Sequence, residues 1–490
     1  MTPPCASASI ASWAGVCRPR SLIAVRIAIV ALAFAAMCLL PARADARATA
    51  DPTAGEPQRI FLPLAAVSRP PNVFGVQMYG TLGAPYQYIS RAQPGGVAWV
   101  RFETSWQQIE PVNTEPSEFN YSVLDESVSV AQQEGLQLIL TIGSNPPWAA
   151  TYRNGPIDKV EIGEFVQYVV ALVERYDGDG WQDAPGSPRV KHWELYNEPD
   201  GGSVISAELG SGAYWGHYGA EYAAMLCALY PAVKAADSEA QILLGGIAYD
   251  HFIEDNGAFV RGFIDDVLWH GGGACVDMMN FHYYPYFEAR WAPYGDGLAG
   301  KAAYLRDRLS KYNLDHLPMV VTEAGHHSND YADYPSTPEE QASYVLKLFV
   351  QSMSARLEFM IWWTWVDLPP SSYWGTTGLL TATGETKPAY LAYQQARARL
   401  GQSYFRRELS PGETGNASAR VYQFNGNRTF YVAWSTTGIP QTIRIPGTEV
   451  VLTDLYGHVQ GATSDSDDGS VDGYVRVTVD AQPKYVEPVR

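Results

Sequence analysis

The feature that most limits the fold of this 490-residue chain is an alternation between short apolar runs and segments with helical periodicity. The helical segments, in which apolar residues recur every three or four positions, include residues 162–175, 220–236, 301–309 and 338–354. Eight apolar runs have the length of buried strands, at residues 73–78, 97–102, 136–142, 190–196, 242–247, 278–283, 319–322 and 359–366. Eight strand–helix repeats are typical of a TIM barrel, so we predict an α/β fold with a (β/α)8 barrel over residues 73–400.

The pattern changes after about residue 400. Apolar residues now alternate with polar ones at a period of two, with frequent turns, at residues 429–434, 442–445, 450–455 and 475–479. We therefore predict that residues 401–490 form a small C-terminal β-sandwich, an accessory domain packed on the barrel.

The amino-terminal segment has the composition of a secretory signal peptide. Three arginines precede a 14-residue apolar run at 27–40, and small residues in an Ala-x-Ala pattern follow it. This run is shorter than the roughly 20 residues of a membrane span, although an uncleaved anchor is the alternative. We predict a signal peptide at residues 1–46, a linker at 47–72, and a secreted or extracytoplasmic protein with no stable membrane span.

Charge and aromatic content narrow the class of partner. The formal net charge is −18, and the first 44 residues carry four Arg and no acidic residue, so the remainder is more negative still. Nucleic acid is therefore excluded as a partner. The 14 Trp and 31 Tyr residues provide surfaces on which sugar rings stack, although most individual aromatic residues belong to the core.

Two cysteines, Cys227 and Cys275, lie beyond the predicted signal peptide. Cys227 falls inside a helical segment and Cys275 just before a strand. We expect two unpaired buried thiols, with a disulfide as the alternative.

Two glutamates stand where predicted strands end. Glu198 follows the fourth run, in Asn197-Glu198-Pro199, and Glu323 directly follows the seventh, in Thr322-Glu323-Ala324-Gly325. They are 125 residues apart, but a barrel brings the carboxyl ends of its strands together, where its active sites lie. A pair of carboxylates breaks a glycosidic bond when one donates a proton and the other attacks the sugar or activates water.

Several strand-end motifs are shared with a known group of enzymes. They are Val100 to Trp106, Pro146-Pro147-Trp148-Ala149, Trp193 to Pro199, His282-Tyr283-Tyr284-Pro285, Thr322-Glu323 and Trp362-Trp363-Thr364-Trp365. Over residues 73–400 the chain resembles the retaining glycoside hydrolases of clan A, most closely family 39 and its relatives. The resemblance implies cleavage of O-glycosidic bonds in oligo- or polysaccharides, without a cofactor, with β-xylosides or related sugars as substrates. The alternative is a non-catalytic carbohydrate-binding protein on a decayed barrel.

The resemblance also implies roles for the catalytic residues. Glu198 would be the acid/base, with a capping or ion-pairing glutamate as the alternative reading. Glu323 would be the nucleophile, kept ionised by Arg101 and Tyr284. Glu194 is in phase with Glu198 along the strand, which places the two on the same face. We therefore expect the Glu194 side chain to point into the barrel as a structural carboxylate.

Three further residues would bind the substrate. Asn197 would hydrogen-bond the sugar 2-hydroxyl, with a turn-forming role as the alternative. His282 would face the substrate, unless it is a core histidine. Trp363 and Trp365 share a face by strand alternation, and we expect Trp365, which is nearer the strand end, to form the floor under the reacting sugar.

No metal site is predicted. The acidic residues between Asp177 and Asp183 resemble part of a calcium loop but lack its final glutamate, so an Asp-Gly turn is the simpler interpretation. His326 and His327 follow the nucleophile without a third ligand at metal spacing, which indicates a loop lining the pocket.

Overall fold

The computed structural model describes residues 72–489, apart from 203–213, 332–333 and 369–372. The predicted signal peptide at 1–46, and all but the last residue of the linker at 47–72, lie outside the described residues. Within the described ranges, no helix is both long and apolar enough to cross a membrane.

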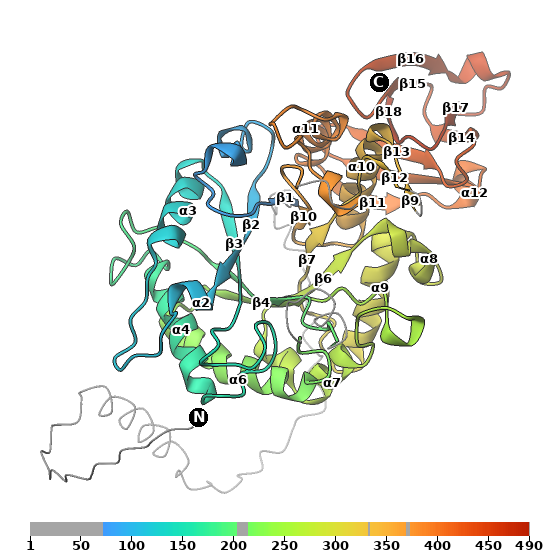
Figure 1. Ribbon diagram of the computed structural model, residues 1–490. Helices are drawn as coiled ribbons and strands as arrows, with labels where there is room; N and C mark the ends of the chain where they lie inside the picture. Colours follow the sequence, from blue (N-terminus) through green and yellow to red (C-terminus); the bar gives the residue numbers. More distant parts are fainter. Residues whose placement is uncertain (1–71, 203–213, 332–333, 369–372, 490) are drawn as a thin grey trace, which may run out of the picture. The chain divides into compact units, whose positions relative to one another are not determined.

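Eight parallel strands form the central sheet (Figure 1), and each lies within or overlaps one of the eight predicted runs. They are β1 (Phe74–Gln77), β2 (Trp99–Ser105), β3 (Gln137–Gly143), β4 (His192–Asn197), β5 (Gln241–Gly246), β6 (Met279–Tyr283), β7 (Met319–Ala324) and β10 (Met360–Trp362). Their order is β5-β4-β3-β2-β1-β10-β7-β6. Isolated parallel bridges from Leu243 to Met278 and from Ile247 to Phe281 join the two ends of this order. The sheet is therefore a nearly closed barrel of the TIM type.

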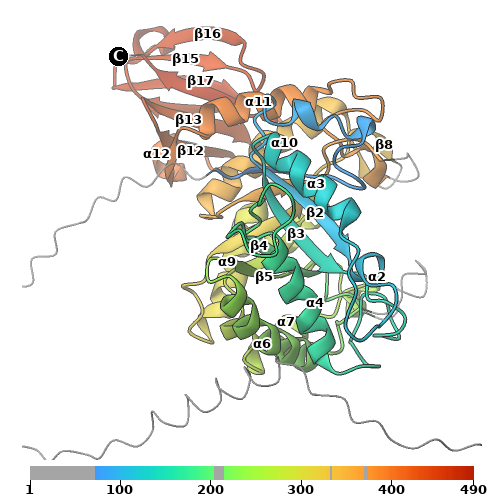
Figure 2. The same cartoon turned by 90° about the vertical axis from the view of Figure 1, so that its left-hand side faces the viewer.

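Helices cover the outside of the barrel (Figures 1 and 2). Their bounds are α2 (Trp106–Ile109), α3 (Ser122–Gln133), α4 (Ile162–Arg175), α6 (Gly219–Ala236), α7 (Phe263–Trp269), α8 (Glu288–Trp291), α9 (Gly297–Ser310), α10 (Pro338–Ser354) and α11 (Pro388–Leu400). Helices α4 and α10 have the bounds that the periodicity predicts. In α4 the buried residues Phe165, Tyr168, Val169, Leu172 and Val173 recur every three or four positions, so one face packs on the barrel.

The C-terminal region has sheets of its own. Strands β11 (Tyr404–Glu408), β12 (Ala419–Asn425), β13 (Thr429–Ser435), β18 (Lys484–Pro488), β15 (Glu449–Thr453) and β16 (Val459–Ser464) form one antiparallel sheet in that order, while β14 (Gln441–Pro446) pairs with β17 (Tyr474–Val479). Val421 and Tyr431 of the first sheet share a buried cluster with Ile443 and Val477 of the second. The separate C-terminal sheet region is thus shown, and its classification as a β-sandwich stays a prediction.

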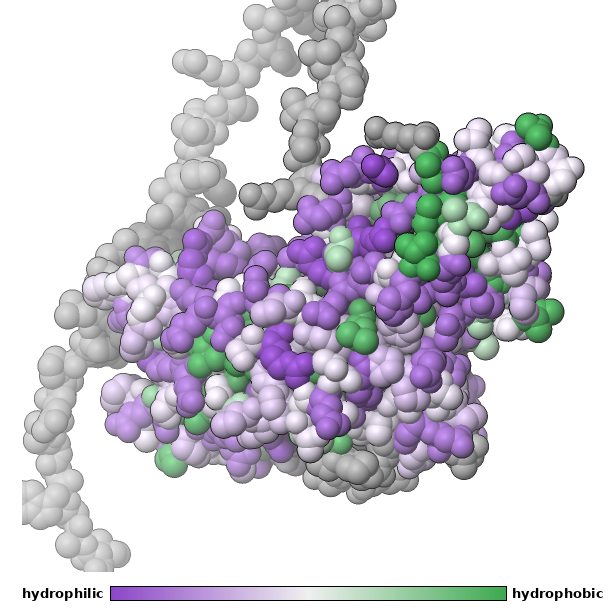
Figure 3. Space-filling model, turned by 90° about the horizontal axis from the view of Figure 1, so that it is seen from above, coloured by the Kyte–Doolittle hydropathy of each residue, from purple (hydrophilic) through white to green (hydrophobic). Residues whose placement is uncertain are grey.

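The outer surface is largely polar on the face shown in Figure 3, where hydrophobic residues lie in small separate groups. Small, scattered apolar groups are normal for a protein surface.

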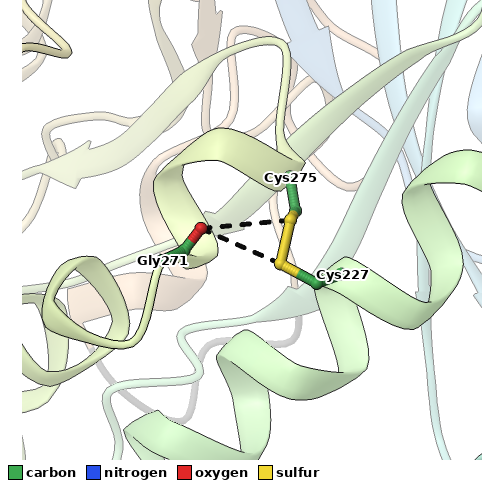
Figure 4. Close-up of a disulfide and its surroundings, with 3 residues drawn as sticks. All are labelled: Cys227, Gly271 and Cys275. Atoms are coloured by element: carbon green, nitrogen blue, oxygen red, sulfur yellow. Dashed lines mark hydrogen bonds between the residues drawn. A yellow bond between two sulfur atoms is a disulfide. The ribbon is translucent and has the colours of Figure 1, made fainter. Parts of the chain in front are cut away.

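Cys227 and Cys275 form a disulfide (Figure 4), so the expectation of two unpaired thiols is wrong. Cys227 lies in α6, and Cys275 ends the short 3-10 helix Gly272–Cys275 that packs against α6. Their Cα atoms are 5.0 Å apart, a spacing that a disulfide spans easily. The sequence did not show that this short helix returns to α6, and tertiary packing alone brings the two residues together.

Removing this disulfide should lower stability. The cross-link joins positions 48 residues apart and so restricts the unfolded chain. We expect Cys227→Ala/Cys275→Ala to lose roughly 2 to 4 kcal/mol of unfolding free energy, measured by urea denaturation. Wild-type protein unfolded in the presence of a reductant is the control, and its unfolding free energy should match that of the variant. Equal stability of oxidised wild type and variant would contradict the pairing.

Candidate active site

The two glutamates occupy the carboxyl ends of β4 and β7. Glu323 lies within β7, and Glu198 directly follows β4. The Glu198 backbone has a left-handed conformation, with φ 45°, and its N–H donates to the Gly246 carbonyl on β5 at 3.0 Å. Left-handed backbone at a residue other than glycine is uncommon and clusters at functional sites. The local backbone thus turns the Glu198 side chain toward the barrel mouth.

The carboxyl groups of Glu198 and Glu323 lie close together. Nδ1 of His282 is 3.0 Å from a Glu198 oxygen and 3.9 Å from a Glu323 oxygen. An oxygen of Glu198 and one of Glu323 lie within 4.8 Å of each other. Their side chains are 26% and 12% exposed, so both reach solvent. The structure therefore places two accessible carboxylates in one site.

Glu323 is held by two donors. The Tyr284 hydroxyl donates to one carboxylate oxygen at 2.6 Å, and the Arg101 guanidinium to the other at 3.3 Å. Burial raises the pKa of Glu323 above its ordinary value, and the Glu198 carboxylate raises it further. The Arg101 charge and the Tyr284 hydrogen bond lower it, and so favour the ionised form.

Arg101 links the catalytic residues to the barrel interior. Its side chain is fully buried and donates to Glu194 at 2.6 Å, to Gln77 at 3.0 Å and to Asn197 at 2.6 Å. Burial alone would raise the pKa of Glu194, but the Arg101 charge and several hydrogen bonds hold it below its ordinary value. Glu194 is thus a satisfied structural carboxylate, as expected from its phase along the strand.

His282 contacts the candidate proton donor directly. Its side chain is 1% exposed, and burial lowers its pKa to about 4, so the imidazole is neutral near pH 7. Nε2 lies 3.2 Å from the Thr322 hydroxyl, which itself donates to Glu194. We assign the tautomer from this network: Nε2–H donates to Thr322, and Nδ1 accepts. The lone pair of Nδ1 therefore faces Glu198 and can accept a hydrogen bond from the protonated Glu198 carboxyl group.

The pKa of Glu198 fits a proton donor. Burial raises the pKa of this carboxyl to about 7. Arg101 and Lys301 lower it, whereas Asp250 and Glu103 raise it. Glu198 is thus partly protonated near neutral pH, as general acid catalysis requires.

Comparison with known families identifies the fold and chemistry. Residues 65–368 match the sequence model of the family named Cellulase (glycosyl hydrolase family 5). The chain belongs to this family. The predicted membership of clan A is confirmed, and the chain is a glycoside hydrolase. A comparison with curated proteins found no match.

Solved structures of other clan members share the fold. A family 39 glycoside hydrolase from Bacteroides cellulosilyticus has a TM-score of 0.66 at 20% identity, covering 86% of this chain and 81% of that one. A family 30 endoxylanase from Clostridium papyrosolvens has a TM-score of 0.55 at 14% identity, with coverages of 85% and 96%. An α-L-arabinofuranosidase from Thermotoga maritima has a TM-score of 0.53 at 11% identity, with coverages of 85% and 96%.

The structure corrects the expected aromatic floor of this glycoside hydrolase. Trp365 is fully buried, and its indole N–H donates to the Gln87 carbonyl, so it does not line the site. Strand β10 ends at Trp362, so strand alternation does not continue to Trp365. Trp363 instead borders the site: its indole N–H donates to the Tyr79 hydroxyl, and its ring lies 6.4 Å from that of Tyr284.

Sequence reasoning missed other residues around the site. A polar cavity of about 250 Å³ lies beside the catalytic centre and is lined in part by Glu103, Arg153, Asn154, Asn197 and Tyr214. Glu103 is two residues beyond Arg101 on β2, so period-two alternation could have placed it on the same inward face. Arg153 and Tyr214 lie outside the barrel strands, where no periodicity identifies them.

The remaining candidates are the acidic residues between Asp177 and Asp183 and the histidine pair His326 and His327. The Asp177 carboxylate accepts the backbone N–H of Asp179 at 3.0 Å, an Asx turn of the expected kind. Asp177, Asp179 and Asp183 also approach one another closely enough to be a candidate cation site among the described residues. His326 and His327 are buried and line a small cavity beside Tyr284.

Proposed function

We propose that the enzyme is a retaining glycosidase that uses double displacement. Glu323 attacks the anomeric carbon, while Glu198 gives its proton to the leaving oxygen. The resulting Glu198 carboxylate then takes a proton from water, which attacks the glycosyl-enzyme ester, and Glu323 departs as a carboxylate. The released sugar keeps its anomeric configuration.

The spacing of the carboxylates carries this proposal. Retaining pairs lie about 5 to 5.5 Å apart, whereas inverting pairs lie about 6.5 to 9.5 Å apart to admit a water molecule. The oxygens of Glu198 and Glu323 approach within 4.8 Å, which supports direct attack by Glu323.

We assign the surrounding residues to binding roles. Arg101 and Tyr284 hold Glu323 in the attacking position through their hydrogen bonds. Arg101 also donates to the side-chain oxygen of Asn197, which leaves its amide N–H₂ group to donate to the sugar 2-hydroxyl. Trp363 supplies the aromatic surface for the sugar ring in place of Trp365.

The substrate is a carbohydrate, and we propose β-xylosides as the first class to test. This follows from the resemblance to family 39 and from the similar fold of an endoxylanase. The family name Cellulase makes β-glucosides the second class. We also propose export by the signal peptide at residues 1–46, which the Cys227–Cys275 disulfide supports because disulfides persist in oxidising compartments.

Activity should depend on the protonation of Glu198. On a panel of aryl β-xylosides, β-glucosides and α-L-arabinofuranosides, we expect the wild-type enzyme to hydrolyse at least one. For the best substrate, kcat/KM should be retained below pH 7 and fall above it, by about tenfold per pH unit, because the free enzyme must hold the proton. The midpoint should lie near the pKa of about 7.

The inactive variant Glu323→Gln is the control for contaminating glycosidases. An inert wild type on the whole panel would contradict the proposed activity. Activity that rises through pH 7 would contradict the assignment of Glu198 as the acid.

A further inference from the structure

A buried ion pair that the proposed mechanism does not use lies behind the proton donor. Lys301 on α9 is fully buried, and its ammonium group lies 2.8 Å from the Asp250 carboxylate. The other Asp250 oxygen accepts the indole N–H of Trp291 on α8 at 2.9 Å. A buried ion pair contributes little net stability compared with apolar residues of similar size. Its presence therefore calls for another explanation.

Hydrogen bonds connect this pair to the Glu198 loop through residues 248–250. The Lys301 ammonium donates to the Ala248 carbonyl as well as to Asp250. Asp200, two residues beyond Glu198, accepts the backbone N–H groups of Ala248 at 3.0 Å and Tyr249 at 2.8 Å. The ion pair and the Glu198 loop thus both hydrogen-bond to the same short segment, residues 248–250.

The two charges also act on Glu198 in opposite senses. Lys301 favours the ionised form of this carboxyl, and Asp250 favours the protonated form. Other charged or titratable groups around Glu198 come from the ends of the neighbouring strands; they are Arg101 and Glu103 of β2, Asp200 after β4, His282 of β6, Tyr284 directly after β6, and Glu323 of β7. Within this set Lys301 and Asp250 form an ion pair whose two charges act on Glu198 in opposite directions.

We propose that Lys301 and Asp250 are positioning residues for the proton donor: through segment 248–250 they hold the Glu198 loop, and their paired charges balance the field at its carboxyl group. This inference rests on the proposed role of Glu198. The pair touches neither substrate nor reacting atoms, so its effect should appear in the pH profile.

The test compares Asp250→Asn with Asp250→Glu in the full-length enzyme, using the aryl glycoside that the wild type hydrolyses best. Asp250→Asn keeps an oxygen for Trp291 but removes the negative charge, leaving Lys301 unbalanced. We expect the basic limb of kcat/KM to move to lower pH by roughly half a unit or more. Asp250→Glu keeps the charge and should keep the wild-type limb, even if kcat falls through altered packing.

The double variant Lys301→Met/Asp250→Asn removes both charges and should return the limb close to its wild-type position. Lys387→Met is the matched control, because Lys387 is also a buried lysine but bonds to Asp367 and Thr376. Its basic limb should not move. Circular dichroism checks that each variant is folded. If Asp250→Asn does not fold, Lys301→Met alone serves the comparison: it leaves the Asp250 charge unbalanced, so its basic limb should move to higher pH.

An unchanged basic limb in folded Asp250→Asn, or in Lys301→Met if Asp250→Asn does not fold, would overturn the inference. A wild-type enzyme that lacks a basic limb near pH 7 would instead contradict the proposed function itself. The two failures are therefore distinguishable.

Discussion

Replacing Glu323 with alanine should reduce kcat/KM by roughly 10⁵-fold or more, because no other group can form the covalent intermediate. The carboxylate sits between Tyr284 and Arg101, which orient its two oxygens. Removing it leaves the proton donor without a partner nucleophile. Steady-state kinetics with an aryl glycoside measure the loss.

Added azide provides the sharper test of this role. The shortened side chain of Glu323→Ala leaves space for a small anion to attack the anomeric carbon directly, giving a glycosyl azide of inverted configuration. The matched control, Glu323→Gln, fills that space with an amide and should not be rescued. Activity of Glu323→Ala within tenfold of wild type would contradict the nucleophile assignment.

Glu198→Gln should show a loss that depends on the leaving group. For an alkyl or sugar leaving group, which needs protonation, we expect roughly a 10²- to 10⁴-fold fall in kcat/KM. For a dinitrophenolate, which leaves without a proton, the fall should be small. The basic limb near pH 7 should also disappear, since we assign that limb to the Glu198 carboxyl, whose pKa is raised to about 7.

Measuring kcat/KM against leaving-group pKa for wild type and variant reveals this difference as a steeper slope. Glu103→Gln is the matched control, because Glu103 is a second carboxylate at the barrel mouth that lines the neighbouring cavity. Its slope should equal that of wild type. An equal loss of Glu198→Gln on every leaving group would mean that Glu198 does not donate the proton.

The barrel and the convergence of the two glutamates were predictable from local pattern. Each strand of a parallel barrel is buried on both sides, so it forms a continuous apolar run, and eight such runs were readable. Barrel topology then places Glu198 and Glu323 at one rim, and their oxygens do approach within 4.8 Å. The link from Arg101 to Glu323 was implied by the resemblance to clan A, and the structure shows it as a hydrogen bond of 3.3 Å.

What the sequence did not reveal depends on contacts between distant segments. The disulfide required the knowledge that the 3-10 helix ending at Cys275 packs on α6. Trp365 was misplaced because strand alternation was extended past Trp362, where β10 ends. Lys301 lies in a helix of ordinary composition, and only the fold shows that its ammonium group reaches Asp250 behind the site.

The stereochemistry of hydrolysis tests the central claim most directly. Proton NMR of the reaction with an aryl glycoside follows the anomeric signal of the first sugar released, before mutarotation. Double displacement through Glu323 predicts that the first product has the same anomeric configuration as the substrate. A first product of opposite configuration would contradict the account, since it would require water, and not Glu323, to attack the sugar.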